Sequence, residues 1–312
     1  MSSRIAFVFP GQGSQYAGMG KELVQVYPAS KDIFDEADAN LDKKISSLCF
    51  EGPEEALNQT VNTQLAMFVC DIAALALIKE KAEPTMVAGH SLGEYAALVA
   101  ASVISFESGL KLVAERAKIM EKYAKSAKGK MAAVLGLKKE VVEEAIDSLN
   151  KDEELVVANY NSPYQQVISG TAELITQATP LLMEKGAKRV VELKVAGGFH
   201  SPLMKEAQEE FASVLQEEEF NDAQVPVVSN YTASASTSGL ALKEALAKQI
   251  TGSVKWQQTI ELMVGVGIDT FIELGPGHVL SSLIKRQASQ AVTFATEDEK
   301  SVKETLARLE EE

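Results

Sequence analysis

Hydrophobic and polar positions along the chain divide it into short apolar runs and longer segments with helical periodicity. The short runs predict strands, and the periodic segments predict helices between them. Outside the middle of the chain, the predicted strands are residues 5–9, 85–88, 225–229, 270–274 and 291–295. The predicted helices are residues 21–39, 52–57, 62–80, 96–101, 106–127, 201–219, 240–249, 254–264 and 279–288. Strands that alternate with helices indicate an α/β fold, in which helices cover both faces of a parallel sheet.

The middle of the chain has a different pattern. Strands are predicted at residues 131–137, 155–159, 166–169 and 189–194, and helices at residues 138–150 and 172–185. This βαββαβ order is that of a ferredoxin-like unit, which can close by itself. We therefore expect residues 128–196 to form a small subdomain inserted into a large domain, which consists of residues 1–127 and 197–312.

The stretch from Thr85 to Tyr95 has the most distinctive chemistry. An apolar run meets Gly89-His90-Ser91-Leu92-Gly93, and a small-residue helix follows, which matches the G-x-S-x-G nucleophile elbow. The turn is so tight that side chains at the two glycine positions are expected to strike neighbouring backbone. Ser91 is expected to be a nucleophile in a strained conformation at a helix N-terminus, where free N–H groups favour an oxyanion. The alternative is an ordinary turn that contains a serine.

A glycine-rich loop, Pro10-Gly11-Gln12-Gly13-Ser14, follows the first predicted strand. It lacks the third glycine of the dinucleotide-binding pattern, and Glu22 follows Lys21 where the P-loop requires Ser or Thr. The sequence therefore does not predict a phosphate site here. A nucleophile elbow needs a second oxyanion donor from a separate strand–helix loop, and this loop is the candidate. The alternative is a flexible turn.

A serine hydroxyl is a weak nucleophile without a base, and the chain has three histidines. His90 precedes Ser91, and adjacent side chains on an extended chain point in opposite directions, so we interpret His90 as structural. His278 lies in a Gly-Pro-Gly-His turn that can cap a helix. His200 follows a glycine pair between the two predicted domains and is the preferred base. Acidic residues are too numerous for spacing to select a third member of a triad.

Composition narrows the class of protein. The chain has 312 residues, of which 46% are hydrophobic and 24% charged, as is ordinary for a globular protein. Its formal net charge of −14 argues against general affinity for nucleic acid. We expect no apolar run of the ~20 residues that cross a bilayer and find no signal-peptide pattern. Cys49 and Cys70 lack metal spacing and are interpreted as reduced core residues of a cytoplasmic protein.

Several motifs coincide in chain order over nearly the whole length, and together they resemble the malonyl-CoA:acyl carrier protein transacylases of bacterial type II fatty acid synthesis. The motifs are Phe9-Pro10-Gly11-Gln12-Gly13-Ser14-Gln15, Thr63-Gln64, Gly89-His90-Ser91-Leu92-Gly93-Glu94-Tyr95, Arg116, Asn161-Ser162-Pro163, Gly198-Phe199-His200-Ser201 and Glu273-Leu274-Gly275-Pro276-Gly277. The resemblance implies a hydrolase-like α/β core with an inserted ferredoxin-like subdomain, which agrees with the insertion predicted above.

The resemblance also implies roles for individual residues in the reaction. Ser91 is the nucleophile and His200 its base, and a backbone carbonyl at Gln249 orients the histidine in place of a carboxylate. The backbone N–H groups of Gln12 and Leu92 form the oxyanion hole.

The remaining implied residues bind the substrate. Arg116 holds the malonyl carboxylate, because a planar guanidinium pairs bidentately with a carboxylate and stays charged when buried. Phe199 occupies a position that is bulky in malonyl-selective relatives, and Met120, Asn161 and Gln249 are expected in the same pocket.

The implied reaction moves a malonyl group from malonyl-CoA to the phosphopantetheine thiol of acyl carrier protein, through a malonyl-serine intermediate. Neither a metal nor a redox cofactor is required, and a monomer that binds neither nucleic acid nor a membrane is expected. The alternatives are a serine hydrolase or thioesterase, a carrier-binding module with an inactive site, and a trans-acting acyltransferase of a polyketide pathway. A lysine-rich window from Lys111 to Lys139 is expected to dock the carrier protein, the alternative being a solvated helix face.

Overall fold

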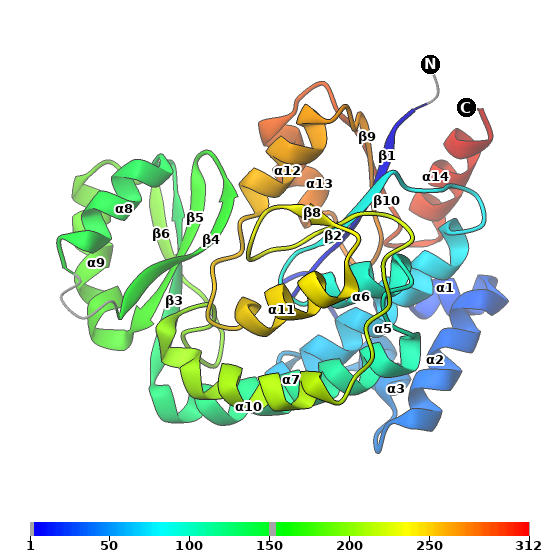
Figure 1. Ribbon diagram of the computed structural model, residues 1–312, viewed down its shortest axis with the longest axis horizontal. Helices are drawn as coiled ribbons and strands as arrows, with labels where there is room; N and C mark the ends of the chain where they lie inside the picture. Colours follow the sequence, from blue (N-terminus) through cyan, green and yellow to red (C-terminus); the bar gives the residue numbers. More distant parts are fainter. Residues whose placement is uncertain (1–2, 150–153, 312) are drawn as a thin grey trace.

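Two sheets organise the chain in a computed structural model that describes residues 3–149 and 154–311 (Figure 1). The larger sheet has six strands in the order β10-β9-β1-β2-β7-β8, and its neighbours are parallel except for the edge pair β7 and β8. The strands are β1 Ile5–Phe9, β2 Met86–Gly89, β7 Val227–Val228, β8 Ala235–Ser236, β9 Thr270–Glu273 and β10 Val292–Ala295. The predicted parallel sheet is thus confirmed, with one short antiparallel strand at its edge.

Helices surround this sheet on both faces. They are α1 Lys21–Val26, α2 Pro28–Asn40, α3 Ile45–Glu51, α4 Glu54–Leu57, α5 Thr60–Ile78, α6 Gly93–Ala100, α7 Phe106–Ala127, α10 Lys205–Gln216, α11 Gly239–Gln249, α12 Trp256–Gly265, α13 Val279–Gln287 and α14 Glu299–Glu311. Successive strand residues point to opposite faces. Phe7 and Phe9 of β1 therefore pack in the core cluster that contains α5, whereas Ala6 and Val8 pack in the cluster that contains α12 and α13.

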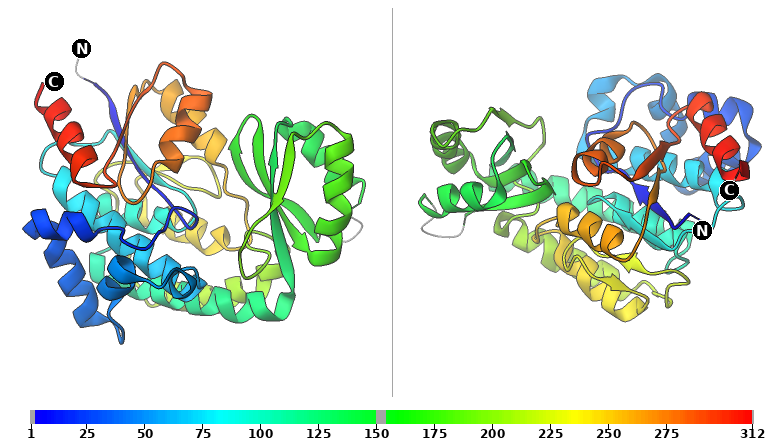
Figure 2. Two further views of the ribbon diagram at one scale, coloured as in Figure 1. Left: turned by 180° about the vertical axis from the view of Figure 1, so that it is seen from behind. Right: turned by 90° about the horizontal axis from the view of Figure 1, so that it is seen from above.

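The smaller sheet is antiparallel, with the strand order β4-β5-β3-β6. Its elements follow one another as β3 Gly129–Leu135, α8 Lys139–Asp147, β4 Leu155–Ser162, β5 Gln165–Thr171, α9 Ala172–Glu184 and β6 Arg189–Glu192. The predicted βαββαβ order is confirmed, and the spatial order is that of a ferredoxin-like unit. The unit projects as a lobe beside the larger sheet (Figure 2). We propose residues 128–196 as an inserted subdomain, because this sheet and both of its helices lie within that range.

The two faces of the smaller sheet have different neighbours. One face packs with α8 and α9 in a core cluster of its own. Met131 and Val167, on the other face, belong to the main core cluster and turn toward the large domain. Val254, which precedes α12, pairs with β4 through hydrogen bonds of 2.8 and 2.9 Å to Ala158 and Tyr160. The second face of this sheet is therefore held close to the end of β2.

Some elements differ from the prediction. The predicted helix 21–39 is two helices, because Pro28 has no N–H to continue a helix and Tyr27 before it is extended. The predicted helix 201–219 begins with a separate 3₁₀ turn, Pro202–Met204, before α10. Helices α3 and α14 were missed, and α14 buries only Val302 and Thr305, so its apolar signal is weak. The predicted helix 138–150 ends at Asp147 as α8, and its last residue lies outside the described residues.

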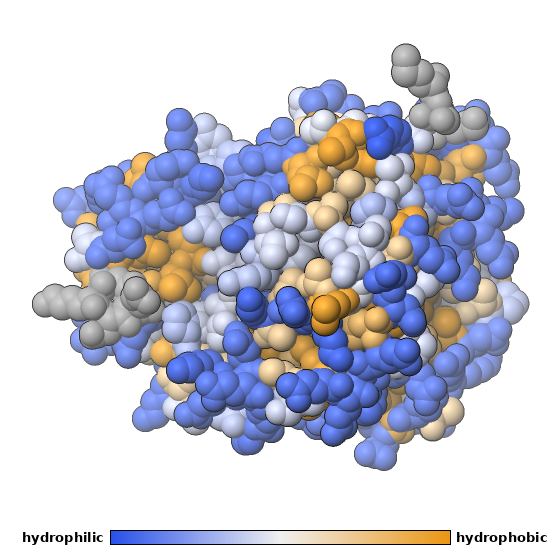
Figure 3. Space-filling model, in the orientation of Figure 1, coloured by the Kyte–Doolittle hydropathy of each residue, from blue (hydrophilic) through white to orange (hydrophobic). Residues whose placement is uncertain are grey.

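The expectation that no apolar run is long enough to cross a membrane is wrong for α5. Within the described ranges, this one helix has the length and composition of a membrane span. Its apolar composition has another cause, because 78% of the apolar window is buried inside the protein, between the sheet and the surrounding helices. The protein face in Figure 3 is mainly hydrophilic, with hydrophobic residues in small, separated patches.

Candidate active site

The turn between β2 and α6 has the geometry of the predicted elbow. Ser91 has φ 51°, in the left-handed region that is strained for a residue other than glycine. A Cβ atom at Gly89 would lie 1.9 Å from the carbonyl carbon of Gly93, and one at Gly93 would lie 2.1 Å from the carbonyl oxygen of Phe9. Both glycines are therefore required sterically, and the predicted strain at Ser91 is confirmed.

Asn230, which the sequence analysis missed, fixes the elbow from the end of β7. Its side-chain oxygen accepts a 2.6 Å hydrogen bond from the Ser91 N–H, and its side-chain nitrogen donates one of 2.6 Å to the Gly89 carbonyl. The Asn230 side chain is fully buried. One carboxamide thus satisfies the backbone groups on both sides of His90, which helps to hold Ser91 in its strained conformation.

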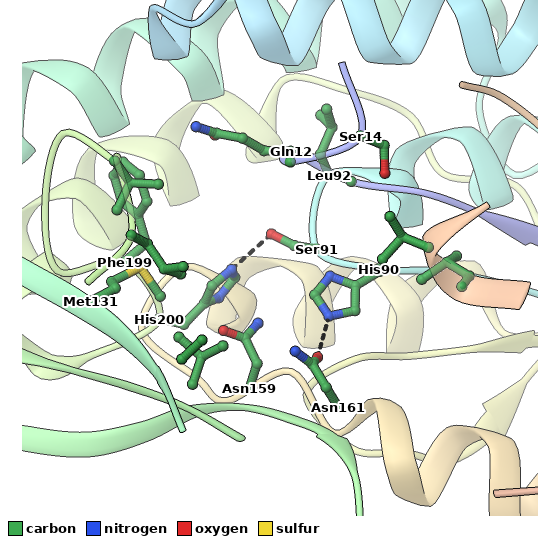
Figure 4. A pocket seen from close by; sticks show the side chains of 18 of the residues that line it. Gln12, Ser14, His90, Ser91, Leu92, Met131, Asn159, Asn161, Phe199 and His200 are labelled. Carbon is green, nitrogen blue, oxygen red and sulfur yellow. Dashed lines mark hydrogen bonds between the residues drawn. The ribbon is translucent and has the colours of Figure 1, made fainter. Parts of the chain in front are cut away.

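Ser91 and His200, which the sequence predicts to be nucleophile and base, are in hydrogen-bond contact. The Ser91 Oγ atom lies 2.7 Å from His200 Nε2. A dashed line marks this contact in Figure 4. The other ring nitrogen, Nδ1, lies 2.8 Å from the Gln249 carbonyl oxygen and 3.2 Å from the Gly252 carbonyl oxygen. Carbonyl oxygens only accept hydrogen bonds, so Nδ1 carries the proton and Nε2 is free to accept one from Ser91.

The surroundings of His200 keep its ring neutral. Burial, followed by the nearby Arg116 charge, lowers the pKa of His200 from its usual 6.5 to about 3, although the carbonyls of Gln249 and Gly252 act in the opposite direction. A neutral imidazole is the form that can accept the Ser91 proton at neutral pH.

Arg116, from α7, brings a buried positive charge close to Ser91. Its side chain is 1% exposed, and its Nη2 atom lies 3.2 Å from Ser91 Oγ. The guanidinium donates to two carboxamide oxygens, of Gln64 at 2.6 Å and of Gln249 at 3.0 Å, and lies 5.5 Å from the Tyr95 ring centre. Among the described residues Arg116 has no ion-pair partner, and its Nε–H has no acceptor. A desolvated cation without a counter-ion is costly, so this site favours an anionic ligand.

Gln249 connects the base to the guanidinium. Its backbone carbonyl accepts from His200, and its side-chain oxygen accepts from Arg116. Its side-chain nitrogen donates to the Glu94 carboxyl at 2.6 Å and to the Ser91 carbonyl at 2.9 Å. Burial raises the pKa of Glu94 to about 7, against the opposing effect of the hydrogen bond from Gln249. The predicted contact between the Gln249 carbonyl and His200 is present. The contacts of the Gln249 side chain with Arg116, Glu94 and Ser91 were not predicted.

A cavity of about 350 Å³ opens in front of Ser91, between the elbow and the smaller sheet. The predicted residues that line it are Gln12, Ser91, Leu92, Arg116, Met120, Asn161, Phe199 and His200. Gln249 lies behind this wall. In the described part of the chain, the backbone N–H groups of Gln12 and Leu92 donate no hydrogen bond, so both remain available to a ligand.

The other two histidines have different positions. His90 also lines the cavity, with Nε2 2.8 Å from Asn161 Oδ1. The expectation that it points away from Ser91 is therefore wrong, because the positive φ of Ser91 breaks the extended geometry on which that expectation depends. His278 precedes α13 with an exposed side chain 3.4 Å from Glu297 and does not line this cavity.

Most of the charge in the lysine-rich window is paired with acids. Five of its lysines form ion pairs, namely Lys111–Glu218, Lys118–Glu115, Lys122–Glu210, Lys125–Glu121 and Lys130–Glu192. This pairing favours the alternative interpretation, a solvated helix face. In the ranges that the structure describes, no group of three or more His, Cys, Asp or Glu residues is arranged to hold a metal ion.

Comparison with known proteins gives consistent matches over nearly the whole chain. The pattern of the acyl transferase domain matches residues 6–309. A malonyl CoA-acyl carrier protein transacylase of Bacillus subtilis (strain 168) is 44% identical over 312 residues, which cover 99% of this chain and 98% of that protein.

Solved structures agree with this match. An acyl carrier protein S-malonyltransferase from Vibrio cholerae has a TM-score of 0.93 at 38% identity, over 97% of this chain and 100% of its own. A malonyl-transacylase in complex with its type II PKS acyl-carrier protein has a TM-score of 0.95 at 37% identity, over 98% of this chain and 100% of its own.

Proposed function

The chain belongs to the acyl transferase domain family, and from that membership we propose that it transfers malonyl from malonyl-CoA to the phosphopantetheine thiol of an acyl carrier protein. The observation that carries the proposal is the buried guanidinium of Arg116, 3.2 Å from Ser91 Oγ and without an ion-pair partner among the described residues. A malonyl thioester has a carboxylate near its reactive carbonyl. The carboxylate supplies the missing counter-ion when that carbonyl reaches Ser91.

The first half-reaction loads the serine. Ser91 Oγ attacks the thioester carbonyl while its proton moves to His200 Nε2, 2.7 Å away. The negative charge that develops on the carbonyl oxygen is bound by the backbone N–H groups of Gln12 and Leu92. The carbon–sulfur bond then breaks, His200 gives the proton to the departing thiolate, and free CoA leaves malonyl-Ser91.

The second half-reaction runs the same steps in reverse. The thiol of the carrier protein gives its proton to His200 and attacks the malonyl ester. The tetrahedral intermediate collapses with loss of Ser91 Oγ, which recovers the proton. The contact between His200 Nδ1 and the Gln249 carbonyl keeps the ring in the required tautomer through both halves.

Two residues are proposed to select the acyl group. Arg116 favours malonyl over acetyl, because acetyl-CoA leaves the guanidinium unpaired. Phe199, which is 5% exposed and lines the cavity, is expected to crowd a branch at the α-carbon of methylmalonyl-CoA. Met120 and Asn161 complete the walls on either side.

The proposal also covers the cellular location, oligomeric state, cofactors and partners of the protein. We propose a cytoplasmic monomer that needs no metal or redox cofactor and acts on malonyl-CoA and an acyl carrier protein, with no part for nucleic acid or a membrane. The carrier is assigned to fatty acid synthesis. A polyketide carrier is the second candidate, because one structural match was solved with a type II PKS carrier protein.

Intact-mass analysis tests the proposed function. The wild-type enzyme should gain one malonyl group from malonyl-CoA and lose it when holo acyl carrier protein is added. Ser91→Ala should gain nothing, and His278→Ala, outside the cavity, should behave as the wild type does. A malonyl adduct on Ser91→Ala would refute the nucleophile, and loss of the group to water as fast as to the carrier would favour a hydrolase.

A further inference from the structure

One buried polar side chain in the cavity has no hydrogen-bond partner among the residues that the structure describes. The polar side chains that line the cavity and are more than nine-tenths buried are Gln64, Arg116, Asn159, Asn161 and His200. All of them except Asn159 form side-chain hydrogen bonds. The residue Asn159 is 6% exposed, and its carboxamide forms none within the described ranges. Its polar atoms are not among the fully enclosed unpaired atoms of the described residues, so they face the open cavity, where a ligand's polar atoms can pair with them.

The backbone holds Asn159 in a fixed relation to the base. Tyr160 N–H donates to the Val254 carbonyl at 2.9 Å, and Val254 N–H donates to the Ala158 carbonyl at 2.8 Å. The segment that contains Val254 also supplies the Gly252 carbonyl, which accepts from His200. Asn159 and Asn161 project from the same strand into the cavity in Figure 4, but Asn161 already pairs with His90.

The reaction determines which part of a substrate comes to this side of the cavity. His200 Nε2 must reach the sulfur of the leaving or attacking thiol, because it gives that atom a proton in one half-reaction and removes one in the other. In the pantetheine arm, a short ethylene spacer joins this sulfur to a secondary amide. That amide must therefore enter the cavity beside His200.

The wall that the arm meets is mostly apolar. Its apolar side chains from the smaller sheet and the segment after it are Met131, Ala133, Val167, Leu193 and Val195. A secondary amide that leaves water for such a wall needs both a donor and an acceptor in the protein. The carboxamide of Asn159 offers both, because its oxygen accepts and its nitrogen donates.

We propose that Asn159 is a substrate-binding residue that hydrogen-bonds the amide nearest the sulfur of the pantetheine arm. This inference rests on the proposed function and adds how the thiol side is recognised, whereas Arg116 recognises the acyl side. CoA and a holo carrier protein share this arm and little else. Binding of its first amide lets one site orient both thiols for His200.

Thioesters of decreasing length test the inference. The wild type, Asn159→Leu and Asn161→Leu are each acylated with malonyl-CoA, malonyl-N-acetylcysteamine, which keeps only the first amide, and malonyl ethyl thioester, which has no amide. The measured quantity is kcat/KM for formation of malonyl-Ser91, with thermal melting as the check on folding. The wild type must form the adduct with malonyl-CoA and pass it to holo carrier protein, or the proposed function itself fails.

We expect Asn159→Leu to lower kcat/KM about tenfold for both amide-bearing thioesters, the effect of one buried hydrogen bond, and to leave the ethyl thioester unchanged. Transfer to holo carrier protein should slow by a similar factor. The matched variant Asn161→Leu removes a carboxamide that His90 already uses, so any loss should be the same for all three thioesters. An equal loss for all three with Asn159→Leu, or no loss at all, would overturn the inference.

Discussion

Removal of the Arg116 guanidinium is the most informative perturbation of this site. Arg116→Ala takes away the only charged group that contacts Ser91 in the described ranges and leaves the Gln64 and Gln249 oxygens without their donor. The Ser91–His200 contact does not pass through Arg116, and His200 is oriented by backbone carbonyls. The variant should therefore keep a working nucleophile and lose its preference for a carboxylate.

The size of the effect follows from the hydrogen bonds that a malonyl carboxylate would make. A bidentate pair forms two charge-assisted hydrogen bonds, each of which contributes roughly 1.5–3 kcal/mol. Arg116 gives up its 3.2 Å contact with Ser91 Oγ to form them, which offsets one of the two. The net loss in Arg116→Ala is then that of one such bond, about 1.5–3 kcal/mol, or roughly 10- to 150-fold in kcat/KM for malonyl-CoA.

The assay compares kcat/KM for malonyl-CoA and acetyl-CoA on the wild type, Arg116→Ala and Arg116→Lys. Acetyl-CoA makes no use of the guanidinium, so its value should change little or improve. Lysine keeps the charge but not the planar fork, so Arg116→Lys should fall between the other two for malonyl-CoA. An Arg116→Ala enzyme that kept the full preference for malonyl over acetyl would refute the carboxylate-binding role.

Three other perturbations separate the remaining roles. His200→Ala should slow acylation by roughly 10²–10⁴-fold, the usual effect of a positioned base, and His278→Ala far less; the reverse ranking would exclude His200 as the base. Phe199→Ser should raise kcat/KM for methylmalonyl-CoA relative to malonyl-CoA without loss of the Ser91 adduct. An unchanged ratio would show that the Phe199 side chain does not exclude a branch at the α-carbon of the acyl group. The lowered pKa of His200, about 3 instead of 6.5, means that the unfolded chain binds more protons between these values, so stability is lost as pH falls through that window. From pH 7.5 to 5, urea denaturation should show the wild type losing about 2 kcal/mol more free energy of unfolding than His200→Ala; equal losses would mean that His200 is not held neutral.

The sequence predicts the parts of this site that short-range rules control. The elbow glycines flank Ser91 within five residues, and the steric reason for them is visible in the motif itself. The alternation of strands and helices predicts the parallel sheet, and the sheet brings the ends of β1 and β2 together, so that the loop with Gln12 faces the elbow. These inferences need no knowledge of contacts between distant segments.

Other parts of the site depend on contacts that spacing does not encode. Asn230 lies 139 residues from Ser91 in the sequence, in a polar stretch whose only local signal is a turn. The partners of Arg116 are Gln64 and Gln249, and glutamines in helices are usually solvated, so spacing does not mark these two as buried; only the resemblance to a family points to them. The pairing of the lysine-rich window was not visible in the sequence for the same reason. Its neutralising partners Glu210, Glu218 and Glu192 lie on other elements, which only the fold brings close.

The position of Gln249 explains why a serine and a histidine can serve this reaction without a carboxylate in the usual third place. A carboxylate beside His200 would also lie close to Arg116 and would compete with the substrate for its guanidinium, because Arg116 is within 3.2 Å of Ser91 Oγ. The neutral carbonyl of Gln249 orients the histidine without adding a negative charge, and the side chain of the same residue positions Arg116 through a neutral oxygen. The one acid close by, Glu94, is separated from Arg116 by the Gln249 carboxamide, and burial raises its pKa to about 7. The guanidinium is thus held in place by the neutral oxygens of Gln64 and Gln249, and we expect most of its attraction to remain available to a malonyl carboxylate.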